Sequence, residues 1–400
     1  MAKGFFSPSQ FKSISIFTSR VPKCGLCKLF QTCKSPKMPP SGKGKKRVLI
    51  LAEAPGETED EHGIQLIGKS GQLLIKVLRK LGIDMRNDCW LTNSVICRPP
   101  SNETPTEKQL AYCRPNLLNT IDALKPDIII PLGGTAIKSL LGPLWKEDVG
   151  ATTRWVGWNI PMQKPNCWVC PTYHPSYLIR LKDPTLDMLF ARHLEAAFKL
   201  EGKPWKEIPN YEVECIYPPS HAVKAIREIV AMKKPIAFDY ETNRLKPDHK
   251  EARIVCCSIS NGERTIAYPW HGEAISASLE MVRSPLPKIA SNIKFEERWT
   301  KAQLKTRVRN WWWDTMLAAH WMDNRAGITS IKFQAFVLLG TPSYDDSIKA
   351  FLKGKGASAN SENRIKEAYL GDLLKYCGMD SLVEYQVAMK QRELMGVENE

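Results

Sequence analysis

The chain has 400 residues, with 57 Lys and Arg against 42 Asp and Glu, which gives a formal net charge of +15. This length allows two or three domains with full-sized cores. There is no run of 18 apolar residues and no continuous hydrophobic segment among the first 25, so we expect neither a membrane span nor a secretory signal. Twelve cysteines without such a signal favour a reducing compartment, and we expect a cytoplasmic protein.

The excess positive charge is concentrated at the N-terminus. Residues 1–50 contain eleven Lys or Arg and no Asp or Glu. A basic arm of this kind binds phosphate backbones by releasing counterions, which predicts a nucleic-acid partner. The alternatives are a solvated tail or a transit peptide, although the arm is rich in Lys and leads directly into cysteines.

The first half of the chain alternates between buried strands and amphipathic helices. Apolar runs at 46–52 and 127–132 predict strands, and 70–81 places its leucines and a valine on one helical face. This alternation favours a parallel sheet covered on both faces, a three-layer α/β domain. Four prolines between 202 and 220 predict a linker. The expected division is a basic arm with the first cysteines (1–46), a first domain (47–204), a linker and entry segment (205–232) and a second domain (233–400).

Four cysteines have the spacing of a metal or cluster site. Cys24 and Cys27 form a CxxC pair, and Cys97 and Cys113 are single residues farther along the chain. Four thiolates suit an iron–sulfur cubane. Tetrahedral zinc accepts the same ligands, although its cysteines more often come as two CxxC pairs. Cys33 is an alternative ligand, because it lies six residues after Cys27.

Four motifs surround these cysteines in a fixed order. They are LAEAPGETED from Leu51, IGKSGQLL from Ile67, LTNSVICRPP from Leu91 and YHPSYLIR from Tyr173. Together with the cysteine spacing, they resemble the family 4 uracil-DNA glycosylases, which carry a 4Fe–4S cluster. The resemblance implies that the four cysteines bind such a cluster and that the substrate is uracil-containing DNA.

The resemblance also implies roles for individual residues of the first domain. Asn93 would read the Watson–Crick edge of a flipped uracil. His174 would stabilise the departing uracilate, and Glu53 would position water or support the cationic sugar. Leu66 stands where the family has an aromatic residue that stacks on uracil. Ala52 also replaces the usual Gly before the motif glutamate.

Because stacking on a base is worth about 1–3 kcal/mol, losing the aromatic side chain at Leu66 would lower excision roughly 10- to 100-fold. The alternative function is therefore an exonuclease whose glycosylase-like domain is inactive and serves as a DNA-binding module or polymerase accessory.

Carboxylates follow an apolar strand in the second half of the chain. KPIAFDYET, from Lys234, places Asp239 and Glu241 two residues apart, so both side chains point to one face and can share a cation. Taken alone, this pattern is more typical of a solvated strand end. Farther along, Tyr376 and Asp380 are four residues apart in a predicted helix and face the same way.

Together with SNIKFEERW, from Ser291, these segments resemble the DEDDy 3′–5′ exonuclease domain of family A DNA polymerases. The resemblance implies a ribonuclease H-like (DnaQ-type) fold and two Mg²⁺ or Mn²⁺ ions. The implied ligands are Asp239, Glu241, Glu296 and Asp380. Tyr376 would orient the attacking water, and Asn292 would contact the substrate. Glu296 stands where the family has Asp, and the added methylene moves the carboxylate by about 1.5 Å, so we expect activity to survive.

These resemblances predict a DNA repair or replication enzyme that acts on uracil-containing DNA and on 3′ ends. The combination resembles the front half of some bacteriophage polymerase-type proteins. We therefore expect a separately encoded DNA polymerase as a partner and the cytoplasm of a bacterial or phage-infected cell as the location.

Overall fold

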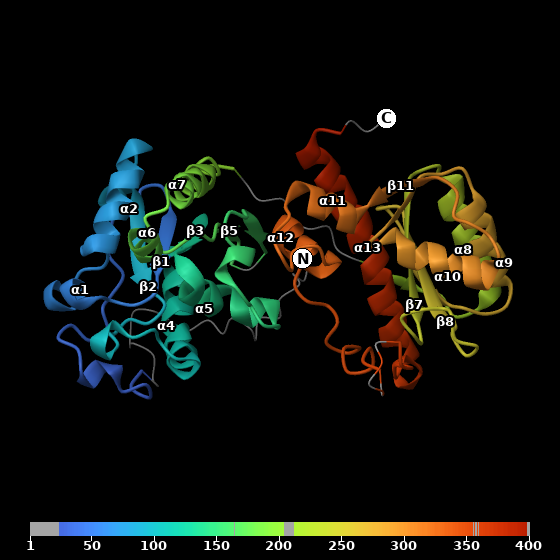
Figure 1. Ribbon diagram of the computed structural model, residues 1–400, viewed down its shortest axis with the longest axis horizontal. Coiled ribbons are helices and arrows are strands. Elements are labelled where there is room, and N and C mark those ends of the chain that lie inside the picture. Colours follow the sequence, from blue (N-terminus) through green and yellow to red (C-terminus); the bar gives the residue numbers. More distant parts are fainter. Residues whose placement is uncertain are drawn as a thin grey trace. The chain divides into compact units, whose positions relative to one another are not determined.

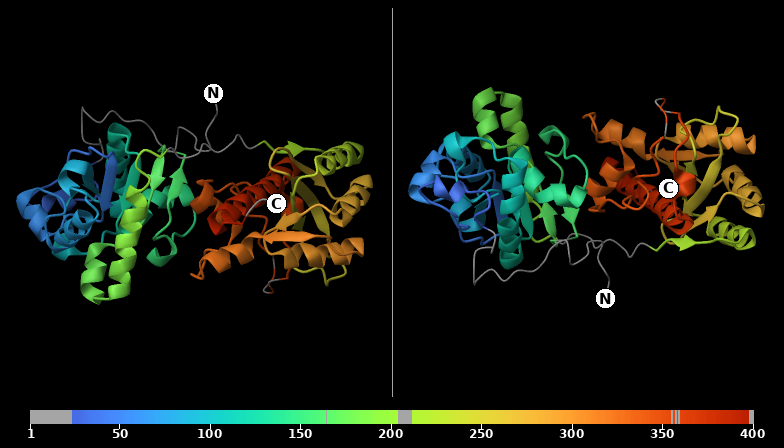
Figure 2. Two further views of the ribbon diagram at one scale, coloured as in Figure 1. Left: turned by 90° about the horizontal axis from the view of Figure 1, so that it is seen from above. Right: turned by 90° about the horizontal axis from the view of Figure 1, so that it is seen from below.

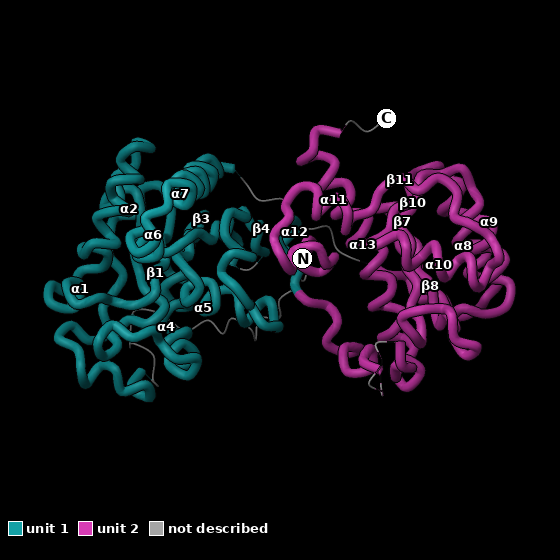
Figure 3. The backbone as a smooth tube through the Cα atoms, in the orientation of Figure 1, with its two compact units in different colours: residues 1–208, 336–342 teal, residues 209–335, 343–400 magenta. Residues whose placement is uncertain are grey.

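A computed structural model describes residues 24–163, 165–203, 212–354, 356, 358 and 360–397. The chain forms two compact units (Figure 3): unit 1 comprises 1–208 and 336–342, and unit 2 comprises 209–335 and 343–400. The first 23 residues of the predicted basic arm lie outside the described residues, as do residue 204 of the predicted first domain and residues 205–211 of the predicted linker. None of the helices within the described ranges is both long and apolar enough to cross a membrane.

Unit 1 is a three-layer α/β domain (Figure 1). Its five-stranded sheet has the order β2-β1-β3-β5-β4, and only β4 runs antiparallel to its neighbour. The strands are β1 (Val48–Ala52), β2 (Cys89–Asn93), β3 (Ile128–Pro131), β4 (Ile160–Met162) and β5 (Cys167–Val169). The helices are α1 (Glu57–His62), α2 (Lys69–Lys80), α3 (Met85–Asp88), α4 (Glu107–Leu124), α5 (Gly133–Trp145), α6 (Pro175–Leu181) and α7 (Pro184–Phe198).

The two central strands of unit 1 have the burial that is typical of a parallel sheet. Every residue of β1 and β3 is buried, as expected for strands with helices on both faces. The register places Ala52 at the end of β1 beside Asn93 at the end of β2. The carboxyl ends of the parallel strands therefore meet at one edge of the sheet, where ligands bind in open α/β folds.

Unit 2 has a mixed six-stranded sheet of order β11-β10-β7-β8-β9-β6. Its strands are β6 (Glu214–Cys215), β7 (Ile236–Thr242), β8 (Ile254–Ser260), β9 (Thr265–Pro269), β10 (Lys288–Ala290) and β11 (Trp311–Asp314). Its helices are α8 (Pro219–Ala231), α9 (Glu273–Arg283), α10 (Ile293–Leu304), α11 (Thr315–Met322), part of α12 (Ile331–Leu339) and α13 (Leu370–Met395). Figures 1 and 2 show α13 on one face of the sheet and α8 and α9 on the other.

The alternation along β7 positions the acidic residues. Phe238 and Tyr240 join the apolar core beneath α8, α9 and α10. Asp239 and Glu241 alternate with these two residues and therefore point to the opposite face of the sheet, where α13 packs. Asp239 and Glu241 thus lie between the sheet and α13.

Asp314 connects two elements of unit 2. It is the last residue of β11 and the N-cap of α11, because its carboxylate accepts the backbone N–H groups of Met316 and Leu317. The same carboxylate accepts the N–H groups of Asn292 and Ile293. Asp314 therefore ties α10 to α11.

Candidate active sites and cysteine cluster

The polar residues predicted for uracil excision lie at the carboxyl edge of the unit 1 sheet. Glu53 directly follows β1, Asn93 ends β2, and His174 is the N-cap of α6 after β5. The Glu53 carboxylate accepts a 2.6 Å hydrogen bond from Thr135 Oγ1. Gly133 has φ +80°, and a Cβ there would lie 2.8 Å from the His174 Cβ. Glycine at this position therefore allows the His174 segment to approach the start of α5.

His174 is held as a neutral imidazole. The backbone N–H of Ser176 donates to Nδ1 at 3.2 Å, so the neutral ring carries its proton on Nε2. Burial, assisted by the charge of Arg180, lowers the pKa of His174 to about 4. The ring can therefore donate a hydrogen bond from Nε2 at neutral pH without carrying a charge.

Leu66 lies in a loop that two charged side chains hold in place. It is 5% exposed and has φ +53°. Arg86 donates to the carbonyl oxygens of Gln65 and Leu66, and Glu59 Oε1 accepts the N–H groups of Ile67 and Gly68. The loop is thus fixed through its backbone, and the Leu66 side chain itself is buried.

The four predicted cluster cysteines gather in one apolar cluster with Cys33. Lys37 N–H donates to Cys97 Sγ at 3.2 Å, and Ile96 N–H donates to Cys113 Sγ at 3.3 Å. Such N–H···S bonds stabilise thiolates that ligate iron. The Asn116 amide nitrogen lies 4.0 Å from Cys24 Sγ and 3.8 Å from Cys113 Sγ. Cys167 and Cys170, the second CxxC, are buried elsewhere in unit 1.

Three carboxylates of unit 2 converge between β7 and α13. Among the described residues, Asp239, Glu241 and Asp380 are the only group of His, Cys, Asp or Glu side chains whose ligand atoms lie within 4.8 Å of one another. Burial and the neighbouring Asp380 raise the pKa of Asp239. Burial likewise raises the pKa of Glu241, with Asp239 and Asp380 adding to the effect. Concentrated negative charge of this kind favours a divalent cation with oxygen ligands.

Two tyrosines bind the third carboxylate of this cluster. The Tyr344 hydroxyl donates to Asp380 Oδ1 at 2.5 Å. Burial raises the pKa of Asp380, while the charge of Lys332 and the hydrogen bonds from Tyr344 and Tyr376 oppose this rise. The Lys332 ammonium lies 5.0 Å from the Tyr376 ring centroid and pairs with Asp345 at 2.8 Å. Helical spacing and the family resemblance predicted Tyr376, whereas Tyr344 and Lys332 belong to no periodic pattern and were not predicted.

Glu296 and Asn292 stand at the start of α10. Glu296 is 2% exposed, and burial and the charge of Asp239 raise its pKa. Asn292 is the N-cap residue of α10 in a left-handed conformation, with φ 68°. Glu296 does not belong to the group of carboxylates whose ligand atoms lie within 4.8 Å of one another. Its role as a metal ligand and the contact of Asn292 with a substrate stay predictions.

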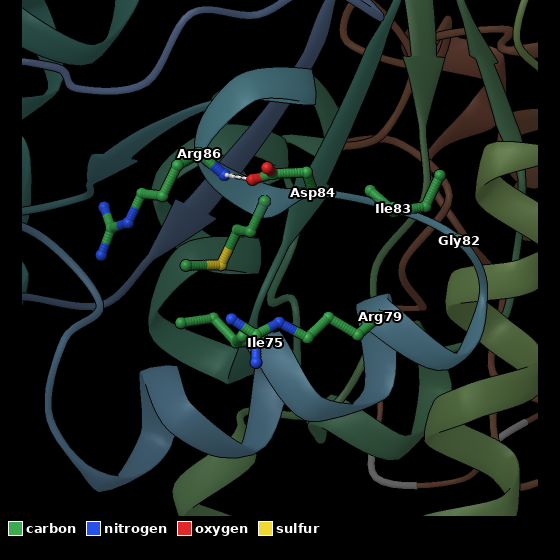
Figure 4. Close-up of a pocket in the computed structure, with 7 residues that line it drawn as sticks. Ile75, Arg79, Gly82, Ile83, Asp84 and Arg86 are labelled. Carbon is green, nitrogen blue, oxygen red and sulfur yellow. Dashed lines mark hydrogen bonds between the residues drawn. The ribbon is translucent and has the colours of Figure 1, made fainter.

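A separate pocket of about 320 Å³ opens beside α2 and α3 (Figure 4). It is lined by Ile75, Arg79, Gly82, Ile83, Asp84, Met85 and Arg86. In the close-up, the Asp84 carboxylate accepts the backbone N–H of Arg86 at 3.0 Å. This pocket contains none of the predicted site residues.

Comparisons with known proteins match this arrangement. Residues 39–198 match the uracil DNA glycosylase superfamily, and residues 213–394 match a 3′-5′ exonuclease family. The chain therefore joins two DNA-processing domains. It belongs, through unit 1, to the type-4 uracil-DNA glycosylases: it is 34% identical over 196 residues to the enzyme of Thermotoga maritima, covering 47% of this chain and 96% of the relative.

A further relative spans both domains. The DNA polymerase of Bacillus phage SP01 is 27% identical over 391 residues, covering 88% of this chain and 40% of the polymerase. Among solved structures, Escherichia coli RNase D aligns with a TM-score of 0.35 and 13% identity, covering 46% of each chain. That structural likeness is too distant to bear on function.

Proposed function

We propose that this protein is a bifunctional DNA hydrolase, a metal-dependent 3′–5′ exodeoxyribonuclease that also releases uracil from DNA. The observation that carries the nuclease is the convergence of Asp239, Glu241 and Asp380 within 4.8 Å. Support for the glycosylase is the polar group of Glu53, Asn93 and His174 at the carboxyl edge of the unit 1 sheet. DNA with uracil and with free 3′ ends is the proposed substrate.

In the nuclease, the carboxylates would hold two Mg²⁺ or Mn²⁺ ions. Such ions polarise the scissile phosphate, generate the nucleophile and stabilise the leaving 3′ oxygen. Tyr376 would orient the attacking water through its hydroxyl, while Tyr344 would hold Asp380 in its orientation. The Lys332 ammonium would lower the local negative charge when the phosphate enters.

In the glycosylase, no metal ion takes part in the bond cleavage. Asn93 would donate to and accept from the edge of a flipped uracil, because one amide offers both functions. The Nε2–H of His174 would donate to the uracil oxygen that gains charge as the glycosidic bond breaks. Glu53, oriented by Thr135, would stabilise the cationic sugar or position water.

This role of His174 predicts a flat pH profile. Because its pKa lies near 4, His174 stays neutral at higher pH, and we expect uracil release in EDTA to vary little from about pH 5.5 to 8. The measurement is the single-turnover rate of release from a labelled oligonucleotide. The exposed His62 serves as a control, since His62→Gln should leave the profile unchanged. A wild-type rate that falls as the pH rises through about 6.5 would instead indicate a charged His174 and contradict the neutral donor.

The cysteine cluster fits a 4Fe–4S cofactor better than zinc. Four sulfurs around one zinc lie about 3.8 Å apart, because Zn–S bonds are about 2.3 Å long. Among the described residues, no three cysteine sulfurs lie within 4.8 Å of one another. A cubane holds its cysteines farther apart, since each binds a different iron. We propose Cys24, Cys27, Cys97 and Cys113 as its ligands.

Replacing one of these ligands tests the cofactor. Anaerobically purified protein should show a broad absorbance near about 400 nm that is lost in Cys97→Ser. The half-buried Cys215 of unit 2 provides a matched control, and Cys215→Ser should keep the colour. A colourless wild-type protein that contains one zinc would rule out the iron assignment.

One assay separates the two activities. In excess EDTA the nuclease is silent, so alkali-sensitive breaks at uracil report only glycosylase chemistry; with Mg²⁺ on uracil-free DNA, trimming reports only the nuclease. Trimming without uracil release would leave unit 1 as a DNA-binding module. We further propose that the nuclease proofreads for a separately encoded polymerase in the bacterial or phage-infected cytoplasm.

A further inference from the structure

Asp60 is a buried carboxylate of unit 1 that takes no part in the proposed steps of uracil excision. It lies on α1 and is 2% exposed. Its Oδ2 accepts the backbone N–H of Lys34 at 3.0 Å, and its Oδ1 accepts the backbone N–H of Ser35 at 2.8 Å. Both partners belong to the segment that follows Cys33, so the Asp60 carboxylate fixes the path of the chain beside the cysteine cluster.

The segment that Asp60 holds, residues 34–38, also binds one of the proposed cluster ligands. The backbone N–H of Lys37 donates to Cys97 Sγ at 3.2 Å. The N–H of Met38 donates to the carbonyl oxygen of the residue before Cys97 at 2.8 Å. The position of this segment therefore decides whether the N–H···S bond to Cys97 forms.

A side chain next to Cys97 makes a second contact with α1. The Arg98 guanidinium lies 3.4 Å from Glu57 Oε1 and 4.0 Å from Asp60 Oδ2. Glu57 is exposed, whereas Asp60 and most of the Arg98 side chain are buried. The chain around the cysteine cluster thus meets α1 at two points, and Asp60 takes part in both.

The residue before Asp60 holds the Leu66 loop, which we define as residues 65–68. Glu59 Oε1 accepts the backbone N–H groups of the last two loop residues, at 3.0 Å and 2.7 Å. Consecutive residues project from a helix about 100° apart, so Glu59 and Asp60 can bind two different segments. Because α1 has only six residues, a movement of Asp60 displaces Glu59 as well.

We propose that Asp60 is a positioning residue that couples the cysteine cluster to the Leu66 loop through α1. The inference rests on the proposed glycosylase function, in which Leu66 occupies the uracil-stacking position. Without the cofactor, segment 34–38 loosens and Asp60 loses its two N–H partners. A buried carboxylate without hydrogen bonds is costly, so α1 shifts toward water and releases the Leu66 loop. The cofactor then supports uracil recognition from a distance.

The competing explanation is that Asp60 only stabilises unit 1 as a whole. Hydrogen–deuterium exchange distinguishes the two explanations. Local coupling exposes the N–H groups of Ile67 and Gly68 while the central strands β1 and β3 stay protected, whereas general destabilisation speeds exchange in those strands as well.

The experiment compares the full-length protein before and after removal of the cluster by ferricyanide and EDTA. We expect residues 65–68 to exchange about 10- to 100-fold faster without the cluster, while β1 and β3 keep their rates. Asp60→Asn should give the same fast exchange in the loop with the cluster bound, because asparagine presents its amide nitrogen to one of the two N–H groups. Its absorbance near about 400 nm should also disappear in air about 10- to 100-fold sooner.

Glu61→Gln is the matched control on the same helix, since Glu61 is exposed and pairs at the surface with the Lys34 ammonium. This variant should keep the wild-type exchange and absorbance. The wild-type comparison needs no substitution, so it decides the question even if Asp60→Asn does not fold.

The outcomes separate this coupling from the glycosylase itself. Equal exchange of residues 65–68 with and without the cluster overturns the coupling, and so does faster exchange throughout β1 and β3. Loop exchange that follows the cluster in a protein that releases no uracil supports the coupling and overturns only the proposed glycosylase. A wild-type protein that binds no iron overturns the coupling together with the cofactor assignment.

Discussion

Asp239→Asn is expected to reduce 3′–5′ trimming in Mg²⁺ by at least about 10³-fold while leaving DNA binding largely intact. Asp239 is one of the three carboxylates that converge within 4.8 Å, and asparagine keeps its shape but not its charge. The measurement is the single-turnover release of a labelled 3′ nucleotide. Asp248→Asn is the matched control, because Asp248 is exposed in unit 2 and pairs only at the surface with Arg298.

The same substitution should have the opposite effect on stability. Burial and Asp380 raise the pKa of Asp239 to about 8, so the folded metal-free protein binds more protons than the unfolded chain above about pH 4. Its free energy of unfolding therefore falls as the pH rises from about 4 to 8. Asp239→Asn should flatten this fall and raise the melting temperature in EDTA at pH 8. A variant that retains trimming, or one destabilised at pH 8, would contradict the proposed role of Asp239.

Local periodicity explains why much of unit 2 could be predicted. The alternation along β7 assigns Phe238 and Tyr240 to one face and Asp239 and Glu241 to the other, whatever the rest of the fold. The spacing of Tyr376 and Asp380 places them on one helical face in the same way. Both patterns depend only on neighbouring residues, so the sequence contains them in full.

Contacts made across the fold could not be predicted in this way. Glu384 meets the backbone of Ser291, 93 positions away, and Tyr344 meets Asp380, 36 positions away. Neither residue has a local pattern that distinguishes it from a surface glutamate or a core aromatic. These contacts form only when α13, α10 and the segment after α12 pack against one sheet.

In unit 1, too, the local patterns could be predicted from the sequence and the contacts across the fold could not. Apolar runs predict β1 and β3, and a parallel sheet then brings the residues after β1 and β2 to one edge. The hydrogen bonds that fix the loop have no sequence signature: Arg86 donates to the Leu66 carbonyl oxygen, and Glu59 accepts the N–H groups of Ile67 and Gly68. The family resemblance predicts that Leu66 replaces an aromatic residue, whereas the structure shows how the backbone of the loop is held.

Asn93→Ala is expected to lower uracil release in EDTA by about 10²- to 10³-fold, provided that unit 1 is active with leucine at position 66. Asn93 is 3% exposed and ends β2, so it presents its amide from a rigid strand. Alanine removes the donor and acceptor together, so the edge of a flipped uracil loses both hydrogen-bond partners. The measurement is the rate at which alkali-sensitive sites form in a uracil oligonucleotide.

Asn87→Ala on α3 is the matched control, because it deletes the same atoms outside the site and should keep the wild-type rate. Leu66→Phe provides the complementary test: restored stacking worth about 1–3 kcal/mol should raise the rate about 10- to 100-fold, if the loop accommodates the ring. Equal rates in wild type and Asn93→Ala, with no gain in Leu66→Phe, would show that uracil is not recognised at the carboxyl edge of the unit 1 sheet. Unit 1 would then bind DNA for the nuclease, and its cysteine cluster would serve that binding alone.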